Sequence, residues 1–494
     1  MKTIGGKLRA GALIGAAALA LTFAAGTPAQ NQNSNGDQWP WGDPTPDNTW
    51  PYAANGHSPV LAVVGDVACE PDADFETNES AHETCDTPKP PYFSTSNPST
   101  PPGSYSLWES QEATANQIEN MKPDAVALLG DLQYQVGEYQ DFEKSYDLTF
   151  GAFKKITRPA PGNHEFYDEH SATGVAGYGY FSYFNGFQIY TATTGNNIAG
   201  QPIMTTLADP CPSTQTGCGF PGATTPVAQP IPRSDGQAGH FEQTGGVGNT
   251  VPAGGTVGVG DGWYSYNLGS WHLISLNIEC ETQPGGCSNL PGTWLAAETE
   301  WLKNDLAANH SACTLAYWHQ PTYSAADSLT EEGITAGAWW QLLYEAGADL
   351  VLNGHDHLYA RYAPIKPYFA AGDTSVAGVT GTWLGTADPK NGIREFIVGT
   401  GGETLDTVVA APTSATDWDG IFNQQFLQAA SGNYWGVMAL TLDPYGYQWN
   451  YTSALEAPVA PAGTPATFTD SGSAFCHGGP NRGGNYQGGQ GNGN

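Results

Sequence analysis

The sequence predicts an α/β layered domain, and two patterns along the chain support that prediction. Short runs of β-branched and other apolar residues occur at 60–64, 125–129, 313–318 and 350–352. Segments in which apolar residues recur at helical spacing lie at 107–121, 294–306 and 339–346. Strands that alternate with helices are typical of a sheet whose faces are covered by helices.

The ends of these elements carry their own signals. Pro123 closes the helix predicted at 107–121, because proline cannot continue a helix. Gly347 follows the helix predicted at 339–346 and is a natural C-cap. The segment 434–452 alternates aromatic and polar residues around a Pro-Tyr-Gly turn, which predicts a hairpin that closes the sheet.

The two termini differ from the rest of the chain. Residues 1–29 contain three basic residues, an apolar stretch at 10–25 and then small residues, which predicts a signal peptide and export to the extracellular or periplasmic space. No later stretch has the ~18 continuous apolar residues of a membrane span. We expect a linker at 30–58 and one folded domain at 59–476. The Gly- and Asn-rich tail at 477–494 is predicted to be disordered, and the Gly-, Thr- and Pro-rich segment at about 192–261 to be a surface insertion.

The charge balance restricts the partners of the protein. Lys and Arg total 16 against 48 Asp and Glu, so the formal net charge is −32. A surface this acidic repels nucleic acid, so we do not expect nucleic acid to be a stable partner of the protein. It would also repel a phosphate-bearing substrate unless cations are bound in the site.

The chain has eight cysteines, which suits an oxidising compartment. Two pairs are seven residues apart, one pair brackets a polar loop, and two cysteines remain for a long-range pair. These pairs are Cys211/Cys218, Cys280/Cys287, Cys69/Cys85 and Cys313/Cys476. The sequence alone leaves the connectivity open. The absence of a C-x-x-C spacing argues against a cysteine zinc site.

Side chains of the kinds that bind metal ions follow the predicted strands or lie in turns. They are Asp66, Asp131, Asn163, His164, His319, His355 and His357. Each of them alone has an ordinary structural interpretation, such as an Asp that hydrogen-bonds its own turn. In open α/β sheets, however, ligands bind outside the carboxyl ends of the strands. We therefore expect these separate segments to converge on one site.

The residue types indicate a particular chemistry. Carboxylates, imidazoles and an amide form a mixed oxygen and nitrogen set that suits Fe, Zn or Mn. One carboxylate can bridge two cations ~3.5–4 Å apart, the separation used for displacement at phosphorus by a hydroxide held between them. An imidazole that binds no metal, such as His164, is suited to protonate the leaving oxygen.

Five motifs in this order resemble the calcineurin-like metallophosphoesterases, and among them the purple acid phosphatases. The motifs are Gly65-Asp66, Gly130-Asp131-Leu132-Gln133-Tyr134, Gly162-Asn163-His164-Glu165, Ala316-Tyr317-Trp318-His319 and Gly354-His355-Asp356-His357. The resemblance implies a four-layer α/β fold, a β-sandwich flanked by helices. It also implies a first ion held by Asp66, Asp131, Tyr134 and His357, and a second held by Asp131, Asn163, His319 and His355. His164 would then act at the phosphate and the leaving oxygen.

Tyr134 decides the subfamily that the sequence resembles. Position 68 is Ala68, where most metallophosphoesterases have a histidine, and Tyr134 stands where purple acid phosphatases place a tyrosinate. A phenolate favours a trivalent ion, so the resemblance implies Fe(III) beside a divalent Fe, Zn or Mn ion. The alternative is that Tyr134 only packs in the core.

These features predict a secreted binuclear-metal phosphatase that hydrolyses phosphate monoesters, similar to acid phosphatases. The segment 320–330 lacks the histidines with which many relatives grip the substrate, so a phosphodiesterase acting on nucleotide or phospholipid head-group diesters remains an alternative. A non-catalytic secreted binding protein is a third. The sequence leaves the natural substrate, the second metal and the oligomeric state open.

Overall fold

We describe the fold from a computed structural model, which covers most of residues 58–478. The larger gaps lie at 72–83, 90–104, 168–176, 207–228, 231–261, 409–425 and 456–465, and shorter ones at 87, 155, 186, 189, 197–201, 282–284, 327–329 and 377–378. The predicted signal peptide at 1–29 lies outside the described residues. So do nearly all of the predicted linker at 30–58, much of the insertion and the tail beyond 478.

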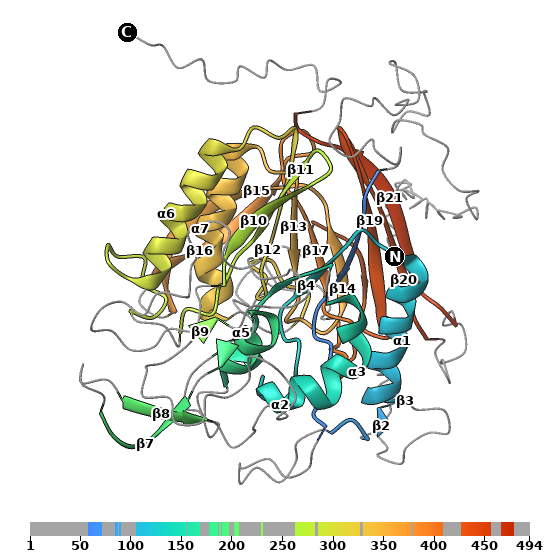
Figure 1. The fold of residues 1–494 in the computed structure, drawn as a ribbon. Helices are drawn as coiled ribbons and strands as arrows, with labels where there is room; N and C mark the ends of the chain where they lie inside the picture. Colours follow the sequence, from blue (N-terminus) through green and yellow to red (C-terminus); the bar gives the residue numbers. More distant parts are fainter. Residues whose placement is uncertain are drawn as a thin grey trace, which may run out of the picture. The chain divides into compact units, whose positions relative to one another are not determined.

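Two mixed β-sheets form the centre of the domain (Figure 1). The first has the order β21 (Thr469–Phe475), β20 (Gly446–Ser453), β19 (Gly436–Asp443), β1 (Val60–Val64), β4 (Ala125–Leu129), β5 (Thr157–Ala160). The second has the order β10 (Tyr264–Leu268), β11 (Trp271–Ser275), β12 (Cys313–Tyr317), β13 (Leu350–Asn353), β17 (Arg394–Val398), β14 (Tyr359–Tyr362), β18 (Leu427–Ser431). β1, β4 and β5 are parallel, as are β11, β12, β13 and β17.

The strands alternate their side chains between two cores. On β1, Leu61 and Val63 pack between the sheets, while Ala62 and Val64 face the helices outside the first sheet. Because side chains in a strand point alternately to opposite faces, a strand buried on both sides is apolar throughout. This explains why β1 and β4 appear in the sequence as continuous apolar runs.

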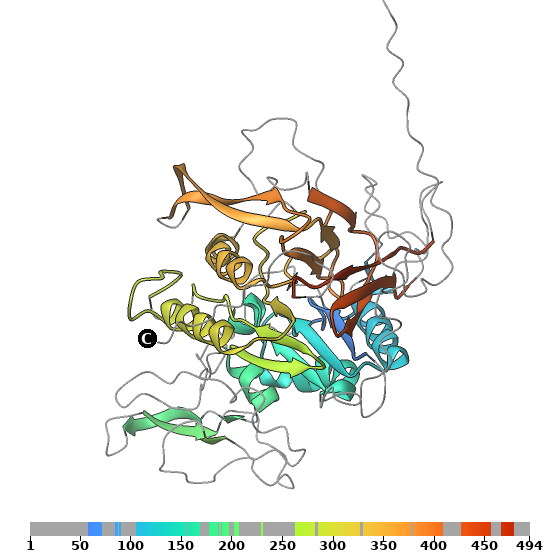
Figure 2. The ribbon, with the colours of Figure 1, turned by 90° about the horizontal axis from the view of Figure 1, so that it is seen from above.

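Helices cover the outer face of each sheet. Helix α1 (Leu107–Met121) contributes Ile118 to the core outside the first sheet. Helices α6 (Trp294–Ala308) and α7 (Glu331–Ala346) pack outside the second sheet, as Figure 2 shows from above. The order helix, sheet, sheet, helix confirms the predicted four-layer α/β sandwich.

The remaining described elements are short helical segments and pairs of strands outside the two central sheets. The helical ones are α2 (Tyr139–Asp141), a π-helical turn at Phe142–Tyr146, α3 (Asp147–Thr149), a 3₁₀ turn at Phe150–Phe153, α4 (Asn163–Phe166) and α5 (Tyr178–Asn185). The paired strands are β2 (Pro88–Lys89) with β3 (Tyr105–Ser106), β6 (Phe187–Gln188) with β9 (Gln229–Pro230), β7 (Tyr190–Asn196) with β8 (Pro202–Thr206), and β15 (Ile365–Val376) with β16 (Val379–Ala387).

The helix ends agree with the sequence signals in part. Helix α1 ends at Met121 as predicted, and Gly347 caps α7 in the left-handed conformation at φ 79°. The predicted start of α7 at Trp339 is wrong, because the helix begins at Glu331. The Thr330 hydroxyl accepts a hydrogen bond from the backbone N–H of Gly333 at 3.0 Å and caps the helix there.

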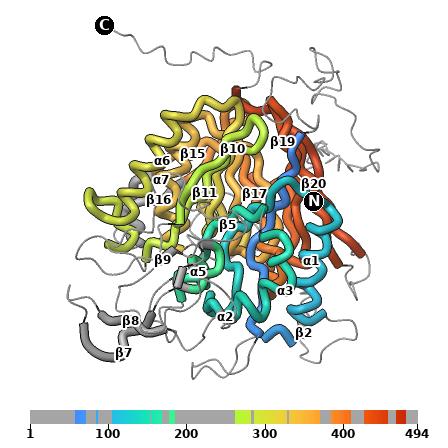
Figure 3. Tube along the Cα trace, in the orientation of Figure 1, coloured from blue at the N-terminus to red at the C-terminus, as the bar shows by residue number. Residues whose placement is uncertain are grey.

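The predicted hairpin at 434–452 is present as β19 and β20, which pair from Asp443 with Gly446 onward. In the same sheet, β19 lies beside β1, so that segments from the two ends of the domain are neighbours (Figure 3). No helix among the described residues is long and apolar enough to cross a membrane.

Three of the four predicted cysteine pairs are disulfides. They are Cys69–Cys85, Cys280–Cys287 and Cys313–Cys476, and Cys211 and Cys218 lie outside the described residues. Cys313 is on β12 of the second sheet, and Cys476 follows β21 of the first. This bond therefore joins the two sheets. The predicted tail begins too early, because the backbone N–H of His477 donates to Asp349 Oδ1 at 2.6 Å.

Candidate metal centre

The candidate site lies at the carboxyl ends of the parallel strands of both sheets. Asp66 follows β1 and Asp131 follows β4, while His355 follows β13. All three adopt positive φ angles, 60°, 49° and 66°. A non-glycine residue in this conformation is strained, and such strain is concentrated at functional sites. The turns that follow these strands are thus shaped to direct polar side chains towards one place.

Two motif glycines allow the close approach of the polar groups. A Cβ on Gly130 would lie 2.4 Å from Nδ1 of His319, and a Cβ on Gly162 would lie 2.3 Å from Oδ1 of Asp131. Both distances are far inside van der Waals contact. The Gly-Asp and Gly-Asn-His motifs therefore have glycine because a side chain there would displace the candidate ligands.

The first group of candidate ligands is centred on the buried hydroxyl of Tyr134. It lies 2.9 Å from Asp66 Oδ1, 3.1 Å from Asp131 Oδ2 and 3.0 Å from His357 Nε2. A hydroxyl has one hydrogen to donate, so it can serve only one of the two carboxylates at a time. A cation bound among them would satisfy the carboxylates, the phenol oxygen and the imidazole together, so this donor set fits a metal ion.

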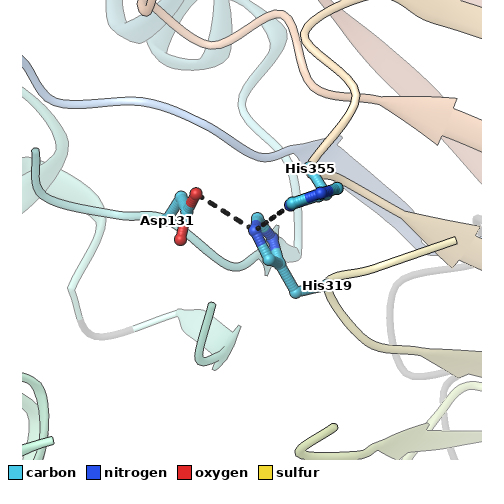
Figure 4. A group of neighbouring side chains, drawn as sticks. All are labelled: Asp131, His319 and His355. Atoms are coloured by element: carbon cyan, nitrogen blue, oxygen red, sulfur yellow. Dashed lines mark hydrogen bonds and ion pairs between the residues drawn. The ribbon is translucent and has the colours of Figure 1, made fainter. Parts of the chain in front are cut away.

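The second group is centred on His319, whose Nε2 lies 3.0 Å from Asp131 Oδ2 and 3.0 Å from Asn163 Oδ1. His355 Nδ1 lies 3.2 Å from the same oxygen of Asn163 and 3.4 Å from His319 Nε2. Figure 4 shows Asp131, His319 and His355 converging from separate loops. Asp131 belongs to both groups, so its carboxylate is placed to bridge two ions.

Backbone carbonyls fix the orientation of two of the imidazoles. Nδ1–H of His319 donates to the carbonyl of Leu129 at 2.8 Å, and Nδ1–H of His357 donates to the carbonyl of Thr404 at 2.7 Å. Because a carbonyl can only accept, each ring carries a proton on Nδ1 and turns Nε2 towards the site. Such outer partners set the tautomer of metal-binding histidines.

Charges within the site shift the pKa values in opposite directions. Burial alone would lower the pKa of His319, but the Asp131 carboxylate raises it to about 10. Burial likewise opposes charge on His357, whose pKa the Asp66 carboxylate raises to about 10. Burial and the charge of His319 lower the pKa of His355 to about 3. Protons on these imidazoles balance the carboxylates, and bound metal ions would take their place.

The pKa of Tyr134 also reflects the negative charge of the site. Burial and the charges of Asp131 and Asp66 raise its pKa well above the usual value for tyrosine. The phenol therefore keeps its proton beside these carboxylates. A nearby cation reverses this effect, because it favours the phenolate.

His164 lies beside the two groups without belonging to either. Its Nδ1–H donates to the carbonyl of Gln135 at 2.6 Å, and its Nε2 lies 3.9 Å from Asp131 Oδ2. Its ring packs on Tyr134 with centroids 4.3 Å apart. The side chain is 19% exposed, so its Nε2 is placed to exchange protons with a group that enters from solvent.

Asn163 and His164, which were expected in a turn, start the short helix α4 after β5. The hydroxyl of Tyr167 accepts a hydrogen bond from Asn163 Nδ2 at 2.9 Å. This bond turns Asn163 Oδ1 towards His319 and His355. The backbone N–H of His164 donates to Asp131 Oδ1 at 2.9 Å and fixes that carboxylate as well.

Glu165 is a site residue to which the sequence reasoning gave no role. Its buried carboxylate accepts hydrogen bonds from the backbone N–H groups of Leu132 at 2.7 Å, Gln133 at 3.2 Å and Gly162 at 2.8 Å. It thereby ties the second motif to the third. Burial and the charge of Asp131 raise its pKa to about 8. Its place in the Gly-Asn-His-Glu motif is a sequence signal, but only the fold shows where the carboxylate points.

Two further carboxylates hold the loop that carries His355 and His357. Asp406 Oδ2 accepts from the backbone N–H of His357 at 2.8 Å. Asp356, which is fully buried, accepts from the Ser324 hydroxyl at 2.6 Å. Asp356 thus anchors the loop from behind and is not one of the candidate ligands.

The fold and the two ligand groups define a candidate binuclear metal-dependent phosphoesterase. No family model matches the chain. A purple acid phosphatase of Arabidopsis thaliana is 34% identical over 110 residues, 22% of this chain and 19% of that protein. An acid phosphatase of Aspergillus ficuum is 28% identical over 149 residues, 23% of this chain and 24% of that protein.

The sequence similarity confirms the resemblance to purple acid phosphatases, while the chain spans only about a fifth to a quarter of the length of these curated relatives. Among solved structures, a purple acid phosphatase from yellow lupin seeds matches 83% of this chain and 53% of that chain, at 17% identity and a TM-score of 0.40.

Proposed function

We propose that this protein is a secreted binuclear-metal phosphatase that hydrolyses phosphate monoesters. The observation that carries the proposal is the position of Asp131. One oxygen of its carboxylate lies near both Tyr134 Oη, at 3.1 Å, and His319 Nε2, at 3.0 Å. A carboxylate shared by two ligand groups is what a pair of bridged metal ions requires.

The first ion would be held by Asp66, Asp131, Tyr134 and His357, and the second by Asp131, Asn163, His319 and His355. The phenol of Tyr134 supports Fe(III) at the first position, with a divalent Fe, Zn or Mn ion at the second. When bound, the two ions would supply an activated water and neutralise the phosphate oxygens. The chain itself would supply the positions of the ligands and the proton transfers.

His164 would donate the proton that the leaving oxygen needs. Gln135 accepts the Nδ1–H and so fixes the ring, and Nε2 faces the site beside Asp131. With a second proton on Nε2, an imidazole held in this way can protonate an alkoxide as the bond to phosphorus breaks. Tyr134 packs against the same ring and restricts its rotation.

The disulfides support an oxidising compartment and thus secretion of the protein, because such bonds form and persist outside the cytosol. Three of them lie among the described residues. The predicted signal peptide at 1–29 supports the same proposal.

A phosphodiesterase is the second candidate function, and the segment after His319 is the observation that favours it. The described residues of this segment near the site include Gln320, Thr322, Tyr323 and Ser324, and none is a histidine. An extra imidazole here would bind the dianionic phosphate of a monoester. Its absence therefore weakens the binding of a monoester more than the binding of a monoanionic diester.

The test compares an aryl phosphate monoester with the bis-aryl diester, using protein reconstituted with Fe(III) and Zn(II). We expect kcat/KM to be higher for the monoester. For Asp131→Asn we expect kcat/KM to fall by about a thousandfold or more for both substrates, since the substitution removes the shared carboxylate. His310→Asn, at an exposed histidine, is the matched control and should be unchanged. Faster diester hydrolysis would favour the second candidate, and an inactive wild type would favour a binding protein.

A further inference from the structure

The tyrosine that follows the Gly-Asn-His-Glu motif lies at the solvent-facing edge of the candidate metal centre. Tyr167 is 42% exposed, whereas Asp66 and Asp131 are 0% and 1% exposed. Its hydroxyl accepts a hydrogen bond from Asn163, one of the candidate ligands. The ring of Tyr167 is thus accessible to a group that arrives from solvent and lies directly beside the site.

Helix α4 fixes Tyr167 in this position. Tyr167 is four residues after Asn163 and three after His164, and residues at these spacings are neighbours on a helix surface. The backbone N–H of Tyr167 donates to the carbonyl of Asn163, and its hydroxyl accepts from Asn163 Nδ2 at 2.9 Å. Because both ends of the side chain are held, the ring loses little conformational freedom when it binds another group.

The ring of Tyr167 also contacts the residue that we propose as the general acid. The ring centroids of His164 and Tyr167 are 4.9 Å apart, and those of His164 and Tyr134 are 4.3 Å apart. Tyr134 is buried, His164 is partly exposed and Tyr167 is exposed, so exposure rises across the three rings. A leaving group begins at the oxygen that His164 protonates and extends away from the phosphate. Tyr167 is the aromatic ring next to that path on the solvent side.

We propose that Tyr167 binds an aromatic group on the alcohol part of the substrate by stacking. This inference rests on the proposed phosphatase function and names the class of phosphate monoester that the site prefers. Aromatic rings attract each other beyond the burial of apolar area, because the face of each ring is negative and its edge is positive. A saturated ring of similar size buries apolar area but lacks this charge distribution. The site is therefore selective for an aromatic leaving group over a saturated one.

A purely structural role of Tyr167 has a different consequence. If the side chain only holds Asn163 through its hydroxyl, a substitution lowers the turnover of all monoesters alike, since Asn163 is a candidate ligand. Stacking instead changes the ratio between an aromatic and a saturated substrate. Tyr167→Phe removes the hydroxyl and keeps the ring, whereas Tyr167→Leu removes both. These two variants therefore separate the two roles.

The test uses benzyl phosphate and cyclohexylmethyl phosphate, whose alcohols have equal numbers of carbon atoms. For the metal-reconstituted wild type we expect kcat/KM to be about fivefold higher for benzyl phosphate, as for one aromatic pair. Tyr167→Phe should lower both values and keep the ratio, while Tyr167→Leu should bring the ratio near one. The Kd values of benzylphosphonate and cyclohexylmethylphosphonate, which are not hydrolysed, should show the same preference and the same response to the two variants.

The matched control is Tyr368→Leu, at a tyrosine of β15 that is 41% exposed and belongs to neither ligand group. It should keep the wild-type ratio. A wild-type ratio near one would overturn the stacking site while the phosphatase function stands. So would a preference that Tyr167→Leu leaves unchanged or that Tyr167→Phe abolishes. If neither substrate nor an aryl phosphate is hydrolysed, the phosphatase function itself fails, and equal Kd values for the two phosphonates would then overturn the stacking site as well.

Discussion

The hydroxyl of Tyr134 lies 2.9 Å from Oδ1 of Asp66, although the two residues follow different strands of the first sheet. β1 and β4 are parallel neighbours, so their carboxyl ends lie side by side. The loop after β4 then returns to β1, since the backbone N–H of Tyr134 donates to the carbonyl of Ala68 at 2.8 Å.

Tyr134→Phe removes the phenol oxygen and little else. In the iron-loaded protein we expect a tyrosinate-to-iron absorption band in the visible range that disappears in this variant. The fold should be kept, because phenylalanine fills the same buried volume. Visible spectroscopy with a circular dichroism control measures both. A band of equal strength in Tyr134→Phe would show that another residue is the chromophore.

His164→Asn should separate proton transfer from metal binding. Its imidazole belongs to neither ligand group, so the metal content should match that of the wild type. We expect kcat for a phosphate monoester to fall by about 10²–10⁴, the usual contribution of a general acid. Steady-state kinetics and elemental analysis of the same sample give the two values. Loss of metal together with activity would make His164 a ligand instead.

Glu165→Gln should weaken metal binding without touching a ligand. The carboxylate accepts from three backbone N–H groups, whereas an amide turns one NH₂ towards them. Residues that orient metal ligands typically contribute about 10–100-fold to metal affinity, and we expect a loss in that range. Competition with a chromogenic chelator measures it. Unchanged affinity would mean that the second and third motifs hold their geometry without Glu165.

The ion pair between Asp470 of β21 and Arg361 of β14 joins the two sheets and should make stability depend on pH. Arg361 Nε donates to Asp470 Oδ2 at 2.6 Å. Burial alone would raise the pKa of Asp470, but the hydrogen bond and charge of Arg361 hold it below the usual 3.8. The pair therefore stabilises the protein fully above pH 3.8, and this contribution is lost as the pH falls through the lower folded-state value.

Asp470→Asn is the variant that tests this pair. We expect it to lower the free energy of unfolding by about 2 kcal/mol at pH 7, a charged hydrogen bond reduced by partial exposure. The difference from the wild type should shrink at pH values well below 3.8. Urea unfolding at several pH values measures it. A difference that does not change with pH would assign the loss to packing, not to charge.

The strands and helices that could be predicted are those whose apolar pattern in the sequence matches the burial of their side chains in the fold. β1, β4 and helix α1 have strong apolar patterns, and the structure places them within the predicted bounds. The start of α7 was missed because Gly333 and Gly337 weaken the helical pattern, although Thr330 is a capping residue. A hydrogen bond from the Thr322 hydroxyl to the carbonyl of Gly333 ties that first part of the helix to the segment after His319.

The candidate ligands could be found because their spacing in the sequence follows strand ends, and strand ends converge in this type of sheet. The residues that support them could not. Asp406 stands in no recognisable motif, and its role depends on which loop lies opposite. Such contacts between distant segments have no local signature.

The number of metal ions per chain tests the binuclear site most directly. After reconstitution and removal of unbound metal, elemental analysis of the wild type should give two ions per chain. His355→Ala should lose the second ion and keep the first, and Asp131→Asn should lose both, because only Asp131 is shared. One ion or none in the wild type, or two in Asp131→Asn, would contradict a binuclear centre bridged by Asp131.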